Sequence, residues 1–414
     1  MDEIFIKEIQ VNAVRNIEKF RIPLSADKKY DLIITGKNGS GKTTLLMELK
    51  TYIGNIANGN LNNYDQQVLH LENFKRQLIG TPSDSNPNNT LLKKNLERNI
   101  QNIQNWLNLF GGTKIVFNET LQLWDYIASG DFIFAFFPAK RHNVFKTPTG
   151  INKINLRQVY NIDEAAGKDF IQYIVNLTAD RSFAKDDNDS ETVIKIDKWF
   201  ADFEENLFRL FDTKNIKLSF DRKNYNFTII EDSKEPYNLN QLSDGYSAIL
   251  SIVTELIMRM EVHKVKNYDV QGVVIVDEIE THLHIELQKR ILPFLTSFFP
   301  KIQFIVTTHS PFVLSSISNA VICDLEKKTV TTDLTGYSYN TLIESYFESD
   351  NYSIELNNKI NEYETLKGKR NLTQEEENQL LTLESYLKEI PKFISNELTV
   401  KLQQIKLKDI KKKQ

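Results

Sequence analysis

The sequence is poor in cysteine, in long apolar runs and in excess charge of either sign. Its 414 residues include one cysteine, Cys323, which excludes an internal disulfide and a zinc site built from cysteines. No window reaches the roughly 18 uninterrupted apolar residues that a membrane helix needs. The N-terminal residues MDEIFIKEIQ lack the basic start and apolar stretch of a signal peptide. We therefore expect a cytoplasmic protein without membrane contact.

Charge gives little guidance to binding partners. The formal net charge is -4, so an affinity for nucleic acid or for an anionic membrane has to come from a local patch. Apolar residues make up 41% of the chain and charged residues 26%, and a chain of this length can bury a large core. The composition predicts a globular protein with more than one lobe.

Short apolar runs alternate with segments of helical spacing over most of the chain. Strands are predicted at residues 4–11, 31–35, 131–137, 216–221, 225–231, 272–278 and 303–309. Helices are predicted at residues 41–53, 91–110, 191–211, 247–263, 287–295 and 374–390. Because strands alternate with helices, we expect an α/β fold in which helices cover both faces of a parallel sheet.

Changes of composition divide the chain into four parts. Residues 1–54 open the core, and residues 55–130, rich in Asn, Gln and Leu, are predicted to be an inserted helical arm with a loop at GTPSDSNPNN. Residues 131–335 complete the core and include a helical lobe at about 155–212. In residues 336–414 Tyr, Asn, Glu and Lys dominate, and we expect a helical C-terminal appendage.

The stretch GKNGSGKT matches the P-loop pattern G-x-x-x-x-G-K-[ST] between a predicted strand and a predicted helix. Its glycines let backbone N–H groups converge on phosphate oxygens at a helix N-terminus. In this motif the lysine neutralises the β- and γ-phosphates and the hydroxyl binds Mg²⁺, so Lys42 and Thr43 take these roles. The residues predicted to bind ATP are Gly36, Asn38, Gly39, Ser40, Gly41, Lys42, Thr43 and Thr44.

Two acids and a histidine follow the later apolar strands. The run GVVIVDE carries Asp277 to a strand end, where it can hold Mg²⁺, and Glu278 beside it can polarise the attacking water. His309 in TTHSPF also follows a strand, at the edge where open α/β sheets bind ligands, and is a second catalytic candidate. Taken alone, the acids fit a solvated strand end and the histidine a structural role. Together with the P-loop they favour an ATPase.

The P-loop, LSDGY (242–246), VVIVDE followed by ETHLH, and TTHSP stand in an order that resembles ABC-type ATPases of the structural-maintenance and overcoming-lysogenization-defect kinds. The resemblance implies an ABC-type P-loop NTPase with a mixed sheet flanked by helices. It also implies a head-to-tail homodimer in which Ser243, Asp244 and Gly245 contact the ATP held by the other protomer.

This chain departs from that family at several positions. Asp244 replaces the usual glycine, Tyr246 replaces the usual glutamine, and PAKRHN stands where a glutamine usually follows a strand. Arg141 in this stretch has two open interpretations, near the phosphates or exposed at the surface. The alternative for LSDGY is a helix cap made by Ser243 or Asp244.

His282 and His284 in ETHLH come just after the acids. Packing at the start of the following helix is the preferred interpretation for these two side chains. Metal binding is disfavoured, because no third ligand is visible.

A narrower resemblance is carried by DEIETHLHIELQKRILPFLTSFFPKIQFIVTTHSPFVLSSI, by SDGYSAIL and by the Tyr-rich C-terminal part. It is to the PtuA-type ATPase subunits of Septu antiphage systems, which also occur in some retrons. The resemblance implies an antiviral defence role, a homodimer or higher oligomer, and an HNH nuclease partner. In retrons it also implies a reverse transcriptase and its multicopy single-stranded DNA (msDNA). Beyond residue 311 no Glu followed by an Asp-x-Asp strand end occurs, so no nuclease site is assigned.

Three functions compete. The leading hypothesis is an ATP-gated scaffold for a nuclease, with helices at about 353–367 and 374–390 as the docking surface; their leucines, Leu380, Leu383 and Leu387, could equally pack on the protein's own core. The second is a DNA-repair ATPase, like the structural-maintenance and RecF proteins, that contacts nucleic acid through the basic tail KLQQIKLKDIKKKQ; such a tail is also typical of a disordered end. The third, the motor subunit of a membrane transporter, fits the LSDGY signature (242–246) but not the long helical inserts or the C-terminal appendage.

Overall fold

The computed structural model describes most of the chain and divides it into two compact units. The described residues are 3–59, 61–82, 87–120, 122–141, 145–211, 216–231, 235–263, 270–343, 354–369 and 372–389. Unit 1 runs from Met1 to Tyr337 and unit 2 from Ser338 to Gln414. None of the helices in the described ranges is both long and apolar enough to cross a membrane.

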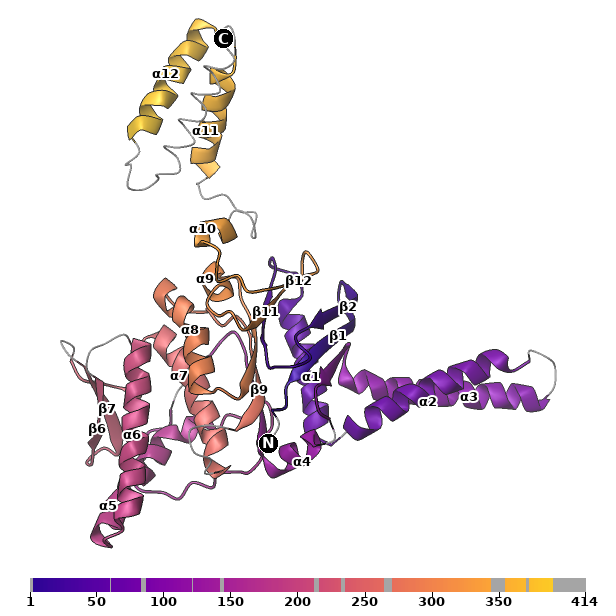
Figure 1. Ribbon diagram of the computed structural model, residues 1–414, viewed down its shortest axis with the longest axis vertical. Helices are drawn as coiled ribbons and strands as arrows, with labels where there is room; N and C mark the ends of the chain where they lie inside the picture. The colour runs from indigo at the N-terminus through magenta and orange to yellow at the C-terminus, as the bar shows by residue number, and fades with distance from the viewer. Residues whose placement is uncertain are drawn as a thin grey trace. The chain divides into compact units, whose positions relative to one another are not determined.

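A six-stranded sheet forms the centre of unit 1 (Figure 1). In spatial order its strands are β12 (Thr329–Thr332), β11 (Ala320–Asp324), β3 (Asp31–Thr35), β10 (Ile302–Thr307), β9 (Gln271–Val276) and β5 (Phe132–Phe137). All neighbours pair parallel except β12, which runs antiparallel to β11. Every residue of β3, β9, β10 and β11 is buried, as parallel strands covered on both faces require. The predicted α/β fold with a mixed sheet is confirmed.

Helices and a second sheet cover the two faces of the central sheet (Figure 1). On one face α1 (Lys42–Ala57) shares a core with the central strands and with a second, antiparallel sheet, to which its Leu45 and Leu49 contribute. On the other face lie α7 (Asp244–Met260) and α8 (Ile285–Phe298). The strands of the antiparallel sheet are β2 (Ile17–Pro23), β1 (Ile6–Val14) and β4 (Thr113–Phe117). The shared core fixes the helix that follows the P-loop.

Strand β4 lies inside the segment 55–130, which the sequence predicts to be a helical insertion. Its residues TKIVF alternate between buried and half-buried positions, and Ile115 pairs with Ile9 of β1. The chain therefore returns to the core at residue 113, because this alternation suits a strand with one buried face.

The insertion proper is a helical hairpin. It consists of α2 (Leu61–Gly80) and α3 (Pro87–Leu107), continued by a short turn at Asn108–Phe110. A further helix, α4 (Leu123–Ser129), follows β4. The loop predicted at GTPSDSNPNN is shorter than expected, since both helices extend into it; residues 83–86 lie outside the described part.

A second lobe of unit 1 combines two helices with a small antiparallel sheet. Helices α5 (Phe170–Asp186) and α6 (Ser190–Phe211) pack together through aromatic rings, among them Phe170 of α5 and Phe203 of α6, whose centroids are 5.4 Å apart. The sheet strands are β6 (Ile216–Asp221), β7 (Asn226–Glu231) and β8 (Tyr237–Asn238). The predicted helix at 191–211 and the predicted hairpin are confirmed, whereas residues 155–166 of the expected helical lobe form no helix.

Unit 2 contains a helical hairpin with its own small core. After the short α10 (Tyr339–Thr341) come α11 (Ile354–Lys367) and α12 (Gln374–Glu389). Its buried residues are Ile360, Tyr363, Leu366, Leu383 and Leu387, and Leu380 packs against them. The leucines of α12 therefore serve the hairpin itself, the second of the two alternatives left open by the sequence.

The start of α12 has the capping box that its sequence predicts. The N–H of Glu376 donates to the Thr373 hydroxyl at 3.3 Å, and the Thr373 N–H donates to the Glu376 carboxylate at 3.1 Å. Two N–H groups that a helix start leaves open are thus satisfied.

A buried ion pair ties the end of α7 to strand β5. Arg259, 1% exposed, donates to the Glu255 carboxylate at 2.7 Å and to the carbonyl oxygen of Phe134 at 2.7 Å. The same carboxylate accepts the backbone N–H groups of Ala166 at 3.0 Å and Gly167 at 2.6 Å. Helix α7, the central sheet and the loop before α5 are thereby joined through two side chains.

We expect Arg259→Ala to lower the free energy of unfolding by about 3 kcal/mol, because it leaves the Glu255 carboxylate buried without its cation. The matched control is Arg181→Ala, which removes a solvent-exposed ion pair with Asp197 and is expected to cost less than about 1 kcal/mol. Urea unfolding of the two variants measures both values. Equal losses would contradict a special role for the buried pair.

Candidate functional site

Parallel pairing brings four segments of interest, namely the P-loop, the acids, the histidine and the PAKR stretch, to one edge of the central sheet. The register pairs Ile34 with Thr307 and places Val276 between Val306 and Phe137, so β3, β10, β9 and β5 end side by side. The P-loop follows β3, the acids follow β9, the histidine follows β10 and the PAKR stretch follows β5. This carboxyl edge is where open α/β sheets bind ligands.

The P-loop has the backbone geometry of a phosphate cradle. Gly36 has φ 135° and Gly41, the residue before α1, has φ 100°; other residues rarely adopt such angles. A Cβ atom on Gly36 would also lie 2.9 Å from the Ser40 hydroxyl and 3.3 Å from the backbone nitrogen of Glu326. Gly36 is therefore required both by its backbone angle and by the close approach of the chain.

The side chain of Lys42 forms hydrogen bonds with the backbone of the P-loop itself. Its ammonium donates to the carbonyl oxygens of Gly36 at 2.8 Å and Lys37 at 3.0 Å, and the side chain is buried. Burial lowers the pKa of Lys42, an effect opposed by the acids of the edge, first of all Glu278 and then Asp277. The lysine is thus a cation held at the edge by backbone oxygens.

The other predicted P-loop residues stand open to a ligand. Asn38, Gly39 and Thr43 are exposed, and Ser40 and Thr44 are half-buried. The Ser40 hydroxyl oxygen is itself shielded from solvent and has no hydrogen-bond partner among the described residues. A phosphate oxygen or a bound water would supply the hydrogen-bond partner that this hydroxyl lacks.

Thr307 connects the two acids. Its hydroxyl donates to the Asp277 carboxylate at 2.6 Å and accepts the backbone N–H of Glu278 at 2.7 Å. Asp277 is buried, whereas Glu278 is half-buried and has φ 44°, a left-handed conformation that costs about 1 kcal/mol for a residue with a side chain. Backbone strain of this kind persists where surrounding contacts hold it, commonly at functional sites.

The donor set fits Mg²⁺. A magnesium ion is typically held by one or two protein oxygens, with waters and phosphate oxygens completing its shell. Asp277 can supply a carboxylate and Thr43 a hydroxyl. In the described part of the chain no group of three or more His, Cys, Asp or Glu side chains could hold a metal by itself.

His309 is positioned by an acid that the sequence reading did not single out. Its backbone N–H donates to the Glu280 carboxylate at 2.6 Å, and the other oxygen of that carboxylate is buried without a hydrogen-bond partner in the part of the chain that the structure describes. Burial and then the nearby Lys42 ammonium lower the pKa of His309, so the imidazole is neutral at neutral pH. In the sequence, Glu280 could have been found as the third acid of the run DEIE (277–280).

Arg141 is buried, with 6% of its surface exposed, so the interpretation as a surface side chain is wrong. Its guanidinium donates to the carbonyl oxygens of Asp277 at 2.7 Å, Glu278 at 3.0 Å and Ile279 at 3.3 Å. Burial lowers the pKa of Arg141 to about 10, which still leaves it charged at neutral pH. The side chain turns inward because these carbonyls offer it partners below the surface.

The signature LSDGY begins α7, but the Ser243 side chain does not cap the helix. Ser243 occupies the N-cap position without a side-chain capping hydrogen bond, and both Ser243 and Asp244 are exposed. Among the described residues no hydrogen bond or ion pair joins either to the P-loop or to the acids. The capping hydrogen bond that the helix-cap alternative requires of Ser243 is therefore not formed, and the side chains of Ser243 and Asp244 face outward.

Gly245 and His282 bring the signature against the segment after the acids. A Cβ on Gly245 would lie 2.8 Å from the His282 carbonyl oxygen, so only glycine fits without a shift. His282 and His284 are exposed, and His284 is the residue directly before α8.

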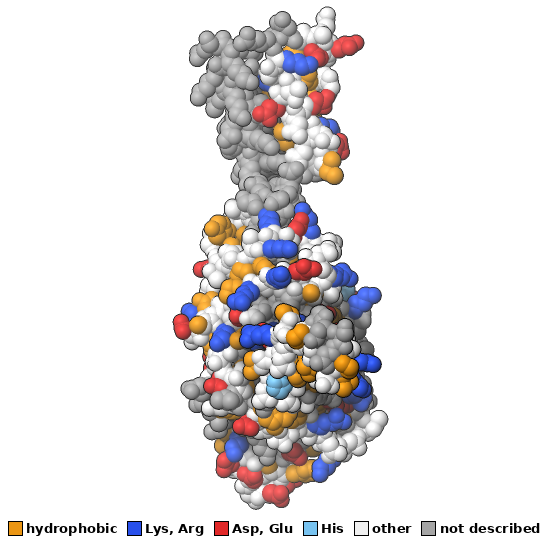
Figure 2. All heavy atoms as spheres, turned by 90° about the vertical axis from the view of Figure 1, so that its right-hand side faces the viewer, with side chains coloured by type: hydrophobic (Ala, Val, Ile, Leu, Met, Phe, Trp, Pro, Cys, Tyr) orange, Lys and Arg blue, Asp and Glu red, His pale blue; other side chains and the backbone are white. Residues whose placement is uncertain are grey.

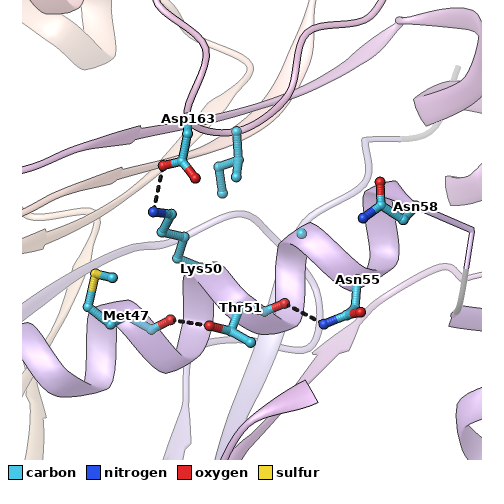
Figure 3. A pocket seen from close by; sticks show the side chains of 8 residues that line it. Met47, Lys50, Thr51, Asn55, Asn58 and Asp163 are labelled. Atoms are coloured by element: carbon cyan, nitrogen blue, oxygen red, sulfur yellow. Dashed lines mark hydrogen bonds and ion pairs between the residues drawn. The ribbon is translucent and has the colours of Figure 1, made fainter. Parts of the chain in front are cut away.

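A cavity of about 350 Å³ lies beside α1, away from this edge (Figure 3). Met47, Lys50 and Thr51 line it from the helix, and the Lys50 ammonium lies 2.5 Å from the Asp163 carboxylate across it. None of the predicted nucleotide-binding residues lines this cavity, so we do not assign the nucleotide to it.

The central part of the chain matches a known protein family. Residues 130–315 match a protein family described as "AAA domain, putative AbiEii toxin, Type IV TA system". Together with the central sheet and the motifs at its edge, the match supports the predicted fold of an ABC-type P-loop NTPase.

Curated relatives narrow the class further. A segment of 87 residues is 40% identical to "Septu protein PtuA" of Bacillus mycoides (strain KBAB4), and one of 94 residues is 37% identical to "Retron Ec83 probable ATPase" of Escherichia coli. These segments cover 21% and 22% of this chain, but only 12% and 17% of the relatives. A longer match, 24% identical, covers 76% of this chain and 74% of "Septu protein PtuA" of Bacillus thuringiensis. The predicted resemblance to PtuA-type ATPases of Septu and retron systems is confirmed.

Among solved structures, the "SMC head domain from Thermotoga maritima" is 14% identical, with 77% of this chain and 94% of that chain covered. The TM-score is 0.35, and at this value the likeness carries no argument about function.

We expect Lys42→Ala to weaken ATP binding at least roughly 100-fold, because it removes the charged donor to the phosphates. The matched control is Lys50→Ala, two turns later on the same helix, which should bind ATP like the parent. Titration calorimetry with Mg-ATP measures both affinities. Parental affinity of the Lys42 variant would overturn the assignment of the P-loop.

Proposed function

We propose that this chain binds Mg-ATP, hydrolyses it slowly, and dimerises around two ATP molecules to regulate a partner nuclease in antiphage defence. The observation that carries the proposal is the edge of the central sheet, where the P-loop, Asp277, Glu278 and His309 follow neighbouring strands. Lys42 and the P-loop N–H groups would hold the phosphates, and Mg²⁺ would supply charge neutralisation there when bound.

In the proposed reaction Glu278 acts as the general base that accepts a proton from the attacking water. Neutral His309 would orient this water or donate a hydrogen bond to the γ-phosphate. The proton leaves the water as its oxygen attacks phosphorus, and ADP is the leaving group. Slow turnover suits a switch, since the ATP-bound state then persists.

The signature supports a composite site. Ser243 and Asp244 are exposed at the positive end of a helix of 17 residues, and such an end attracts phosphate. Because no contact between Ser243 and the P-loop of its own chain occurs among the described residues, we infer that the Ser243 hydroxyl and the N–H groups near Gly245 reach the γ-phosphate held by a second protomer. Two protomers arranged head to tail would then share two ATP molecules.

The partner is proposed from the resemblance to PtuA-type proteins. It would be an HNH nuclease subunit, joined in a retron by a reverse transcriptase and its msDNA, and this chain would have no nuclease site of its own. Unit 2 remains the proposed docking surface, through apolar side chains that its own core leaves exposed: Ile354 (82%), Leu381 (65%) and Tyr386 (40%). The buried leucines of α12 are not available for this.

Direct binding of nucleic acid, as in a DNA-repair ATPase, is the alternative hypothesis. The basic tail on which it rests, residues 401–414, lies outside the described residues. On the face drawn in Figure 2, lysine and arginine side chains are interspersed with acidic and apolar ones. This face therefore adds no support for DNA binding beyond the tail.

We expect Glu278→Gln to lower the rate of ATP hydrolysis roughly 100-fold or more while ATP affinity stays at the parental value, because the variant loses the base but keeps the phosphate contacts. Glu286→Gln, which changes an exposed acid of α8, is the control and should turn over normally. Phosphate release and equilibrium binding are the two measurements. Hydrolysis at the parental rate would place the base elsewhere.

The composite site predicts rescue by mixing. Ser243→Arg and Lys42→Ala should each be inactive alone, since each spoils both sites of its own dimer. Mixed in equal amounts they should regain about a quarter of parental turnover, because about half the dimers are then mixed and each holds one intact site. If the mixture stays as inactive as its components, the signature does not act in trans.

A further inference from the structure

The backbone that carries the proposed base is held from two sides. On its N–H side, Glu278 donates to the Thr307 hydroxyl at 2.7 Å, and the next residue, Ile279, donates its N–H to the carbonyl oxygen of Thr307 at 3.1 Å. On its carbonyl side, the oxygens of Asp277, Glu278 and Ile279 converge on the guanidinium of Arg141. One buried cation therefore gathers three consecutive carbonyl groups.

Arg141 is presented by a fixed frame. It follows β5, whose last residue Phe137 accepts the N–H of Asp277 at 2.9 Å, and its own guanidinium also donates to Pro138 at 3.2 Å. Earlier in β5, the carbonyl oxygen of Phe134 accepts a hydrogen bond from the guanidinium of the buried Arg259. The arginine is thus anchored to the strand that neighbours the acids.

The left-handed backbone of Glu278 needs such support. At φ 44° a residue with a side chain is less stable than in an ordinary extended or helical conformation, and surrounding contacts have to maintain it. This angle decides where the carboxylate points after it leaves the strand. Hydrogen bonds from a charged donor are stronger than those from a neutral one, which suits Arg141 to this task.

We propose that Arg141 is a positioning residue for the catalytic carboxylate: it fixes the backbone of residues 277–279 so that Glu278 points at the attacking water. The inference rests on the proposed function, in which Glu278 is the base. Arg141 itself need not touch the nucleotide.

The test compares Arg141→Ala and Arg141→Lys with the parent in ATP affinity, turnover and Tm. A loss of alignment of about 1 Å at a reacting group can cost roughly 100-fold in rate, so Arg141→Ala should lose about this factor in kcat and keep its affinity for Mg-ATP within about twofold. Arg141→Lys keeps a charged donor but loses the several N–H groups of the planar guanidinium. Its kcat should therefore lie between the values of the parent and of Arg141→Ala. Turnover is measured well below the Tm of each variant.

A double variant separates positioning from general stabilisation. If Arg141 acts through Glu278, Arg141→Ala should add little to the loss already caused by Glu278→Gln, because coupled residues are not additive. Full additivity, or parental kcat in a folded Arg141→Ala, would overturn the inference while leaving the ATPase proposal intact. If Arg141→Ala does not fold, the lysine variant decides: parental kcat in Arg141→Lys overturns the inference. A parental protein that binds no ATP would overturn both.

Discussion

The parallel pairing of β3, β10, β9 and β5 is the constraint on which the rest of the structure depends. These strands are buried over almost their whole length, as parallel strands covered on both faces require. Because all four run in one direction, their carboxyl ends meet at one edge. Segments far apart in the sequence are thereby brought within hydrogen-bonding reach, as the N–H of Thr308, which donates to the carbonyl oxygen of Ile34 at 3.0 Å, illustrates.

Polar side chains set the fine geometry of that edge. Thr307 bridges the acids, Glu280 holds the backbone of His309, and Arg141 gathers the carbonyls after β9. Each of these contacts links the end of one strand to the end of its neighbour. The proposed catalytic groups are therefore held by side chains from other strands, an arrangement that makes the geometry sensitive to small shifts. A nucleotide binding at the P-loop would meet groups that are already aligned.

Local patterns in the sequence predicted much of the fold. DLIIT and GVVIV are continuous apolar runs that form β3 and part of β9, and the helical spacing of residues 191–211 appears as α6. Strand β4 was missed because it is short and lies within a polar, helical segment. Long-range contacts could not be predicted: the partners of Arg141 are up to 138 residues away, and nothing near PAKRHN indicates that its arginine turns inward.

The central claim is that ATP joins two protomers through the exposed signature of each. The most direct test is the mass of purified Glu278→Gln protein in solution, determined by light scattering with and without Mg-ATP. The account predicts that addition of Mg-ATP doubles the mass of the protomer, or increases it further where dimers assemble, and that a Lys42→Ala change abolishes the increase. A mass that is the same with and without Mg-ATP would contradict it.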